Sequence, residues 1–138
     1  MKNYYELGGV FLRLALGAVF IVHGFMKFQG LSGVEQWFAS IGIPGFAAYI
    51  VAPVELIGGL LLVVGLFTRY ASVLLALVMA GAILKVKLGA GFVGANGAAG
   101  YEFDLVLLAG LIHLFLSGSR LYAIDGLLGQ KADKRKAA

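Results

Sequence analysis

Four long apolar stretches constrain the fold of this chain more than any other feature. They run over residues 8–28, 47–67, 70–84 and 103–116. A helix needs about 20 residues to cross a hydrocarbon core of roughly 30 Å. The first two stretches reach that length, and the last two reach it with flanking Ala and Gly or need a locally thinned bilayer. Because 61% of the residues are hydrophobic and only 13% are charged, we expect an all-α integral membrane protein with four helices.

The connections and charges predict how these helices are arranged. The turn FTRY between the second and third stretches is short enough to require an antiparallel hairpin. Basic residues near the ends of spans favour the cytoplasm. An inside N-terminus places more of them inside (Lys2, Arg69, Arg120, Lys131, Lys134, Arg135 and Lys136) than outside (Lys27, Lys85 and Lys87). We therefore expect an up-and-down four-helix bundle over residues 1–128 with both termini cytoplasmic, and a basic cytoplasmic tail over residues 129–138.

The segments outside the spans differ in character. Residues 29–46 carry Gly and Pro around the sequence WFASIG, which predicts a short amphipathic helix with Trp37 at the membrane interface. Residues 87–100 are rich in Gly and Ala and are interpreted as a flexible connector, with folding back over the end of the bundle as the alternative. Residues 117–130 are interpreted as an interfacial segment before a disordered basic tail.

Glu55 lies in the second stretch, where an ionisable side chain costs a few kcal/mol. With a rise of about 1.5 Å per residue, Glu55 lies roughly 12 Å from the outer edge and Arg13 roughly 7 Å from the inner edge. We expect Glu55 to pair either with Arg13 or with His23 and Lys27, which share a helix face at i and i+4. Such a pair either fixes helix register or takes part directly in ligand or proton handling.

Charged residues of both signs are predicted to gather at the outer end of the bundle. Lys85 and Lys87 end the third stretch, and Glu102 and Asp104 begin the fourth. Taken singly, Lys85, Lys87 and Glu102 are typical of boundary residues that reach toward the lipid headgroups. The candidate catalytic residues are His23, Glu55 and Asp104, and the candidate ligand-binding residues are Arg13, Lys27 and Glu102.

Several kinds of site are not expected. The chain has no Cys, which excludes disulfides and thiolate chemistry. His23 and His113 differ by ~10 Å in predicted depth, which does not suit a pair of haem ligands. No metal-ligand spacing, P-loop or dinucleotide-binding motif occurs, so neither a metal nor a cofactor held by this chain alone is expected. The basic tail is interpreted as a topology signal, and nucleic-acid binding is not expected.

Several motifs together suggest a relative. The sequences RLALGAVFIVHGFMKFQG, VELIGG, GLFTR and GYEFD occur in order along residues 13–104. In this combination the chain resembles the DoxX family of small bacterial membrane proteins, and within it the CatD and MhqP type. The resemblance implies a multi-pass protein of the bacterial cell membrane that is an oxidoreductase or an oxidoreductase subunit. The positions that match the family pattern are Arg13, Gly17, Gly24, Lys27, Glu55, Gly58 and Arg69.

The resemblance also implies a functional context. Relatives are linked to thiosulfate:quinone oxidoreduction, to oxidative and thiol stress, and to the handling of catechols and quinones beside a ring-cleaving dioxygenase. The first hypothesis is therefore a quinone-interacting membrane subunit to which a redox partner or a bound quinone supplies electrons. The alternatives are a non-catalytic membrane anchor for soluble redox partners and a small permease for aromatic compounds with Glu55 as proton carrier. A homodimer or a complex with other subunits is expected.

Overall fold

The computed structural model describes residues 2–136, which are mostly helical. Six α-helices form in the order α1 (Lys2–Gln29), α2 (Leu31–Ser40), α3 (Ala48–Val64), α4 (Thr68–Ala82), α5 (Glu102–Ser117) and α6 (Ile124–Lys136). The 3-10 turn η1 (Gly45–Ala47) leads into α3, and α4 continues through the π-helical turn η2 (Ile83–Lys87) and the 3-10 turn η3 (Leu88–Ala90). The two-residue strands β1 (Gly94–Ala95) and β2 (Ala98–Ala99) form an antiparallel hairpin.

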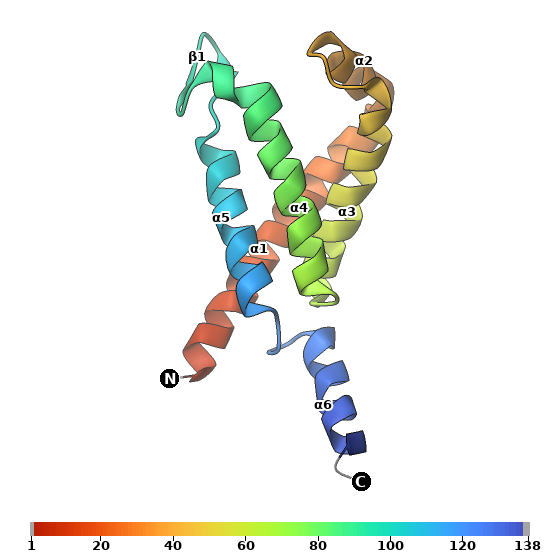
Figure 1. The fold of residues 1–138 in the computed structure, drawn as a ribbon, viewed down its shortest axis with the longest axis vertical. Coiled ribbons are helices and arrows are strands. Elements are labelled where there is room, and N and C mark those ends of the chain that lie inside the picture. Colours follow the sequence, from red (N-terminus) through yellow and green to blue (C-terminus); the bar gives the residue numbers. More distant parts are fainter. Residues whose placement is uncertain (1, 137–138) are drawn as a thin grey trace.

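The long helices run alternately up and down (Figure 1). At one end lie α2 and the β1–β2 hairpin, and we call this the open end. At the other lie the α3–α4 turn, the start of α1 and α6, and we call this the closed end. Three helical segments are long and apolar enough to cross a membrane: Tyr4–Gln29, Gly45–Val64 and Thr68–Ala90. The fourth predicted span corresponds to α5, which has 16 residues.

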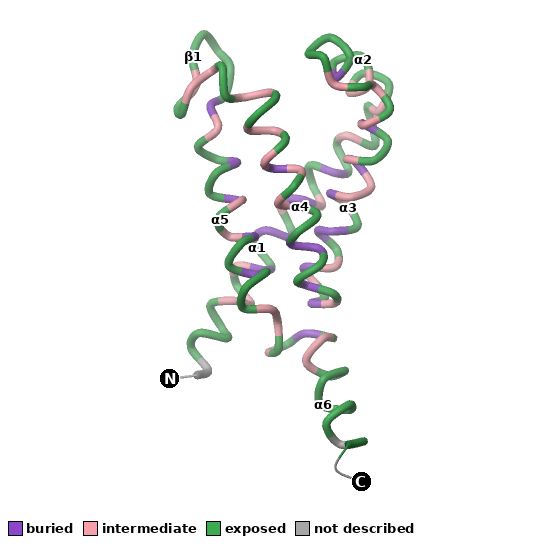
Figure 2. Tube along the Cα trace, viewed as in Figure 1, coloured by how far each residue is buried: buried purple, intermediate pink, exposed green. Residues whose placement is uncertain are grey.

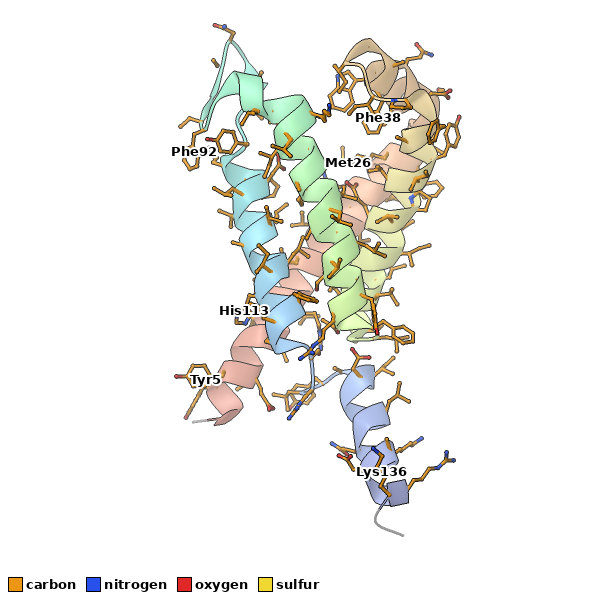
Figure 3. The ribbon with its side chains drawn as sticks, in the orientation of Figure 1. Tyr5, Met26, Phe38, Phe92, His113 and Lys136 are labelled. Carbon is orange, nitrogen blue, oxygen red and sulfur yellow. The ribbon has the colours of Figure 1, made fainter. Side chains whose placement is uncertain are left out.

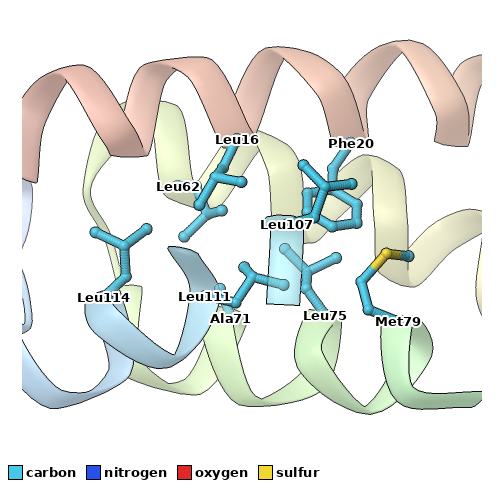
Figure 4. Packing of buried hydrophobic residues seen from close by; sticks show 9 residues of the cluster. All are labelled: Leu16, Phe20, Leu62, Ala71, Leu75, Met79, Leu107, Leu111 and Leu114. Carbon is cyan, nitrogen blue, oxygen red and sulfur yellow. The ribbon is translucent and has the colours of Figure 1, made fainter. Parts of the chain in front are cut away.

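Side chains from α1, α3, α4 and α5 share one core. Its members are Leu16, Phe20, Leu62, Ala71, Leu75, Met79, Leu107, Leu111 and Leu114 (Figure 4). The outer faces of the same helices are also apolar: Phe11, Leu77 and Val106 are 71%, 65% and 69% exposed. Figure 2 shows this alternation of buried and exposed residues along α1, α3, α4 and α5. Apolar side chains on both faces are typical of helices whose outer surface contacts lipid.

Glycines allow α1 and α3 to approach closely. A Cβ atom at Gly24 would lie 2.5 Å from the backbone nitrogen of Leu56, and one at Gly59 would lie 2.8 Å from the carbonyl oxygen of Gly17. No larger side chain fits at these positions without separating the helices. Small residues at such positions let helices pack by close van der Waals contact. Gly81 differs, because no atom lies within 4 Å of a Cβ built there.

The segment after α5 seals the closed end. Helix α3 ends at Gly65, which has the left-handed conformation (φ 67°) usual after a helix. The carboxylate of Asp125 accepts hydrogen bonds from the backbone N–H groups of Phe67 (2.8 Å) and Thr68 (2.9 Å), and the N–H of Asp125 donates to the carbonyl of Gly65 (2.9 Å). Asp125 therefore caps the start of α4 from the far end of the chain.

Removing this cap is expected to destabilise the fold. Asp125→Ala leaves the first N–H groups of α4 without their acceptor, which costs about 1–2 kcal/mol for a typical helix cap. Asp133→Ala is the matched control, because Asp133 is an exposed carboxylate on the same helix, α6. Thermal unfolding in detergent should show a lower midpoint for Asp125→Ala alone; equal midpoints for both variants would contradict this role.

The connecting segments gave one correct and two wrong predictions. The amphipathic helix around Trp37 is confirmed as α2. The flexible connector over residues 87–100 was a wrong interpretation: Asn96 and Gly97 have φ of 53° and 81°, and they turn the chain into the β1–β2 hairpin. The prediction of a disordered tail was also wrong for residues 129–136, because α6 begins at Ile124 and continues through them to Lys136. Residues 137–138 lie outside the described part.

Candidate functional site

A cavity of about 650 Å³ lies at the open end, between the upper halves of α3 and α4. Its walls come from α2, α3 and α4, and α1 and α5 also contribute side chains. Helices α3 and α4 meet at the closed end and diverge toward the open end (Figure 1). The wall is mainly apolar and includes Trp37, Phe38 and Phe103. Phe38 lies on the side of α2 that faces α4 (Figure 3).

Glu55 pairs with Lys27 at the edge of this cavity. The Lys27 Nζ donates to the Glu55 carboxylate at 2.6 Å, and the Glu55 side chain is 3% exposed. The predicted partner Lys27 is therefore confirmed, whereas no ion pair or hydrogen bond joins His23 to Glu55 among the described residues. Since α1 and α3 are in close contact at Gly24, Lys27 one turn further along reaches Glu55 across the same interface.

The alternative partner, Arg13, was a wrong prediction. Arg13 is almost fully buried at the closed end, where its guanidinium donates to the hydroxyl of Ser119 and to the carbonyl of Tyr122 (2.7 Å). Arg13 lies 14 residues before Lys27, or roughly 21 Å along α1. The segment after α5 supplies acceptors for this arginine. Arg13 therefore holds that segment against the bundle.

A second ion pair lies on the opposite side of the cavity. Lys87 Nζ lies 2.7 Å from Oδ2 of Asp104, whose side chain is 7% exposed. This ion pair joins the turn η2 to the start of α5. The predicted mixed cluster at the open end thus contains two acid–base pairs, each with a buried carboxylate. In each pair a lysine ammonium lies beside the buried carboxylate and compensates its charge.

Two further polar side chains line the cavity. His23 lies beside Phe103, with ring centroids 6.5 Å apart and planes tilted by 34°. Lys85 lies in the turn η2, and no carboxylate lies within 4 Å of its Nζ in the part of the chain that the structure describes. His23 and Lys85 leave the cavity with hydrogen-bond donors that these two ion pairs do not occupy.

The structure brings together four of the six candidate residues. His23, Lys27, Glu55 and Asp104 all line the cavity. Among the described residues, Glu102 is exposed and does not line it, and Arg13 lies at the other end. His113, which was not expected to be a ligand, also lies away from the cavity, toward the closed end of α5 (Figure 3).

Sequence reasoning missed the aromatic wall. Trp37 and Phe38 were predicted to lie on an interfacial helix, and both line the cavity. The sequence carried one signal for this wall: two consecutive aromatic residues on a short helix, followed by Gly and Pro, which mark a turn before the next span. Lys85 and Lys87 were interpreted as boundary residues and also line the cavity.

This arrangement suits a flat, largely apolar ligand with polar oxygens. The aromatic and aliphatic walls can remove ring surface from water, and His23 and Lys85 supply hydrogen-bond donors to the cavity. Reduction of a carbonyl oxygen to a hydroxyl requires a group that can donate a proton beside that oxygen.

Comparison with known proteins gives a consistent result. The family model described as DoxX matches residues 8–88. The chain is 50% identical over 125 residues to "Putative oxidoreductase CatD" of Bacillus subtilis, covering 91% of this chain and 90% of that protein. It is 38% identical to "Uncharacterized membrane protein Rv3486" of Mycobacterium tuberculosis (88% and 81% covered) and 32% identical to "Inner membrane protein YqjF" of Escherichia coli (95% and 99% covered). No solved structure matches the chain significantly.

Proposed function

This chain belongs to the DoxX family of membrane proteins, and on that basis we propose that it is an integral membrane subunit of an oxidoreductase that binds quinones or catechols. The observation that carries the proposal is the apolar cavity edged by His23 and by two ion pairs whose carboxylates are buried. Its volume falls within the range of small-molecule sites. The role of the protein is to protect the cell against quinones and against oxidative or thiol stress.

The membrane arrangement that goes with this function is a four-helix transmembrane bundle. In it, α5 is the fourth span, and at 16 residues it covers roughly 24 Å. An even number of spans agrees with the start of α1 and α6 lying at the same end (Figure 1). We place both termini in the cytoplasm and the protein in the inner membrane of a bacterium, so the cavity opens toward the outer half of the bilayer.

Electrons come from outside this chain. It has no Cys, so thiol redox chemistry is not available to it. The electron donor is a redox protein partner or a bound quinone, and a ring-cleaving dioxygenase acts in the same pathway. The chain's own residues bind and orient the ring, and His23, Glu55 and Asp104 are the groups proposed to hold or move protons at its oxygens.

A second candidate function is a membrane anchor for soluble redox partners. The observation that favours it is α6, which projects away from the other helices and carries the exposed basic residues Lys131, Arg135 and Lys136 (Figure 1). A basic helix of this kind suits an acidic protein surface. A truncation after Gly129 separates the two candidates, since it removes these side chains and leaves the cavity intact.

Obstructing the cavity should weaken quinone binding. Trp37 is the only tryptophan and lines the cavity, so bound naphthoquinone should quench its fluorescence in lipid nanodiscs. Gly81 lines the same cavity and has free space around it, so Gly81→Leu should fill the cavity and weaken binding at least ~10-fold without lowering the unfolding midpoint. Gly8→Leu, in open space on α1, is the control.

The cellular counterpart uses the same variants. A deletion strain challenged with a quinone should be protected by the wild type and by Gly8→Leu but not by Gly81→Leu, with equal membrane levels checked by blot. Protection by Gly81→Leu together with failure of the truncation after Gly129 would contradict quinone binding and support the anchor.

A further inference from the structure

The charges around the cavity do not balance. Lys27 neutralises Glu55, and Lys87 neutralises Asp104. Lys85 lines the same cavity, and within residues 2–136 no carboxylate lies within 4 Å of it. Apart from His23, the groups that line the cavity therefore carry one uncompensated positive charge.

We propose that the cavity selects an anionic aromatic ligand, such as an ionised hydroxyquinone, whose charged oxygen pairs with Lys85. This inference rests on the proposed function and names the substrate class of the same site. The ring lies against Trp37, Phe38 and Phe103, and the two ion pairs remain intact beside it. The neutral parent quinone fits the same walls but lacks the charge that Lys85 would bind.

The surroundings of Lys85 support this selection. The side chain is exposed, so without ligand its ammonium stays hydrated and its lack of a partner costs little. An anion bound in the cavity would lie near this ammonium and beside apolar walls. Opposite charges attract each other more strongly there than in bulk water. The carboxylates of Glu55 and Asp104 would repel such an anion if they were free, but each is already paired.

The turn η2 sets the position of this charge. The backbone over Ile83–Lys87 leaves the regular α-helix for a π-helical turn at the point where α4 passes the cavity. Such turns are often found at functional sites. Lys85, Val86 and Lys87 from this turn all line the cavity.

The same anionic chemistry occurs in a lipid phosphate. A phospholipid would satisfy Lys85 with its headgroup and leave its acyl chains against the apolar wall. A free aromatic anion fits better, because the wall includes the aromatic side chains of Phe20, Trp37, Phe38 and Phe103 and the cavity of about 650 Å³ is the size of a small-molecule site. The experiment below separates the two sources.

The test compares two naphthoquinones that differ by one acidic hydroxyl. The probes are 1,4-naphthoquinone, which is neutral, and its 2-hydroxy derivative, which is ionised at neutral pH. Quenching of Trp37 is measured with the full chain in phosphatidylcholine nanodiscs. Wild type should bind the anion about 10-fold more tightly than the neutral ring. Lys85→Gln, which keeps an N–H donor at this position but removes the charge, should lose this preference by binding the anion more weakly, and Lys85→Arg should retain the preference. Lys131→Gln on α6 is the control and should behave as wild type.

Each outcome is decisive. Equal binding of both probes by the wild type, or an anion preference that survives Lys85→Gln, overturns the inference and leaves quinone binding intact. Binding of neither probe overturns both the inference and the proposed function. If adding phosphatidylglycerol to the nanodiscs weakens binding of the anion to the wild type but not to Lys85→Gln, a lipid headgroup occupies the site and the free-anion inference is wrong.

Discussion

Lys27→Met should destabilise the folded protein by about 3–5 kcal/mol, because it leaves a buried carboxylate without its partner. Glu55 has a side-chain exposure of 3%, against 23% for Lys27. The reverse variant, Glu55→Leu, should cost less, since the longer and more exposed Lys27 can reach water. The double variant Lys27→Met/Glu55→Leu should recover most of the lost stability, because replacing both members of a buried pair by apolar groups is often neutral.

Reversible unfolding in mixed micelles measures these four proteins as a double-mutant cycle. Lys85→Met is the control: it removes a lysine from the same cavity, but one without a carboxylate partner among the described residues, so its stability should be unchanged. A double variant as unstable as Lys27→Met would show that the pair contributes more than charge compensation.

The double variant also separates the two roles considered for this pair. It is expected to fold, so its quinone binding can be measured directly. If it still quenches Trp37 on adding naphthoquinone and still protects cells, the pair fixes the contact between α1 and α3. If it folds but fails in both assays, the pair acts on the ligand.

Gly24→Leu should prevent α1 and α3 from packing and abolish the folded protein. The first added carbon already lies 2.5 Å from the backbone nitrogen of Leu56, and the remaining atoms have no space. Backbone must move to relieve such a contact, and even Gly24→Ala should cost about 1–3 kcal/mol. Because Lys27 and Glu55 pair across the same interface, this variant should also separate the ion pair.

The matched control is Gly8→Leu, at an earlier glycine of α1 where no atom lies within 4 Å of an added Cβ. Size-exclusion chromatography in detergent and thermal unfolding should show a single folded species for Gly8→Leu and aggregate or no protein for Gly24→Leu. A folded Gly24→Leu with an unchanged midpoint would contradict the close contact between α1 and α3.

Much of the helical layout could be predicted because the length of each apolar stretch indicates where a long helix runs. The predicted stretch 103–116 matches α5 to within one residue at each end. The stretch 8–28 matches the end of α1, but α1 begins earlier, at Lys2. The third stretch ended at residue 84, but the helical path continues to Ala90. Composition marks where lipid-facing helices run, but their ends depend on local hydrogen bonds, such as the cap that Asp125 gives α4.

The partners of the buried charges were harder to predict. Depth along a helix left two choices for Glu55, and the choice depended on how closely α1 and α3 approach at Gly24. The acceptors of Arg13 come from residues more than 100 positions later in the chain. Long-range contacts of this kind leave no periodic pattern in one sequence. The hairpin at Asn96 and Gly97 was different, because that dipeptide is a strong turn signal and was given too little weight.

The cap at Asp125 has a consequence for the order in which the protein is made. Phe67 and Thr68 are synthesised 58 and 57 residues before the carboxylate that binds their N–H groups. The ribosome therefore delivers every apolar helix to the membrane before the start of α4 acquires its hydrogen-bond acceptor. Assembly of the closed end is then a late step that follows insertion. A chain truncated before Asp125 carries all of its membrane-spanning sequence but lacks the contact that completes it.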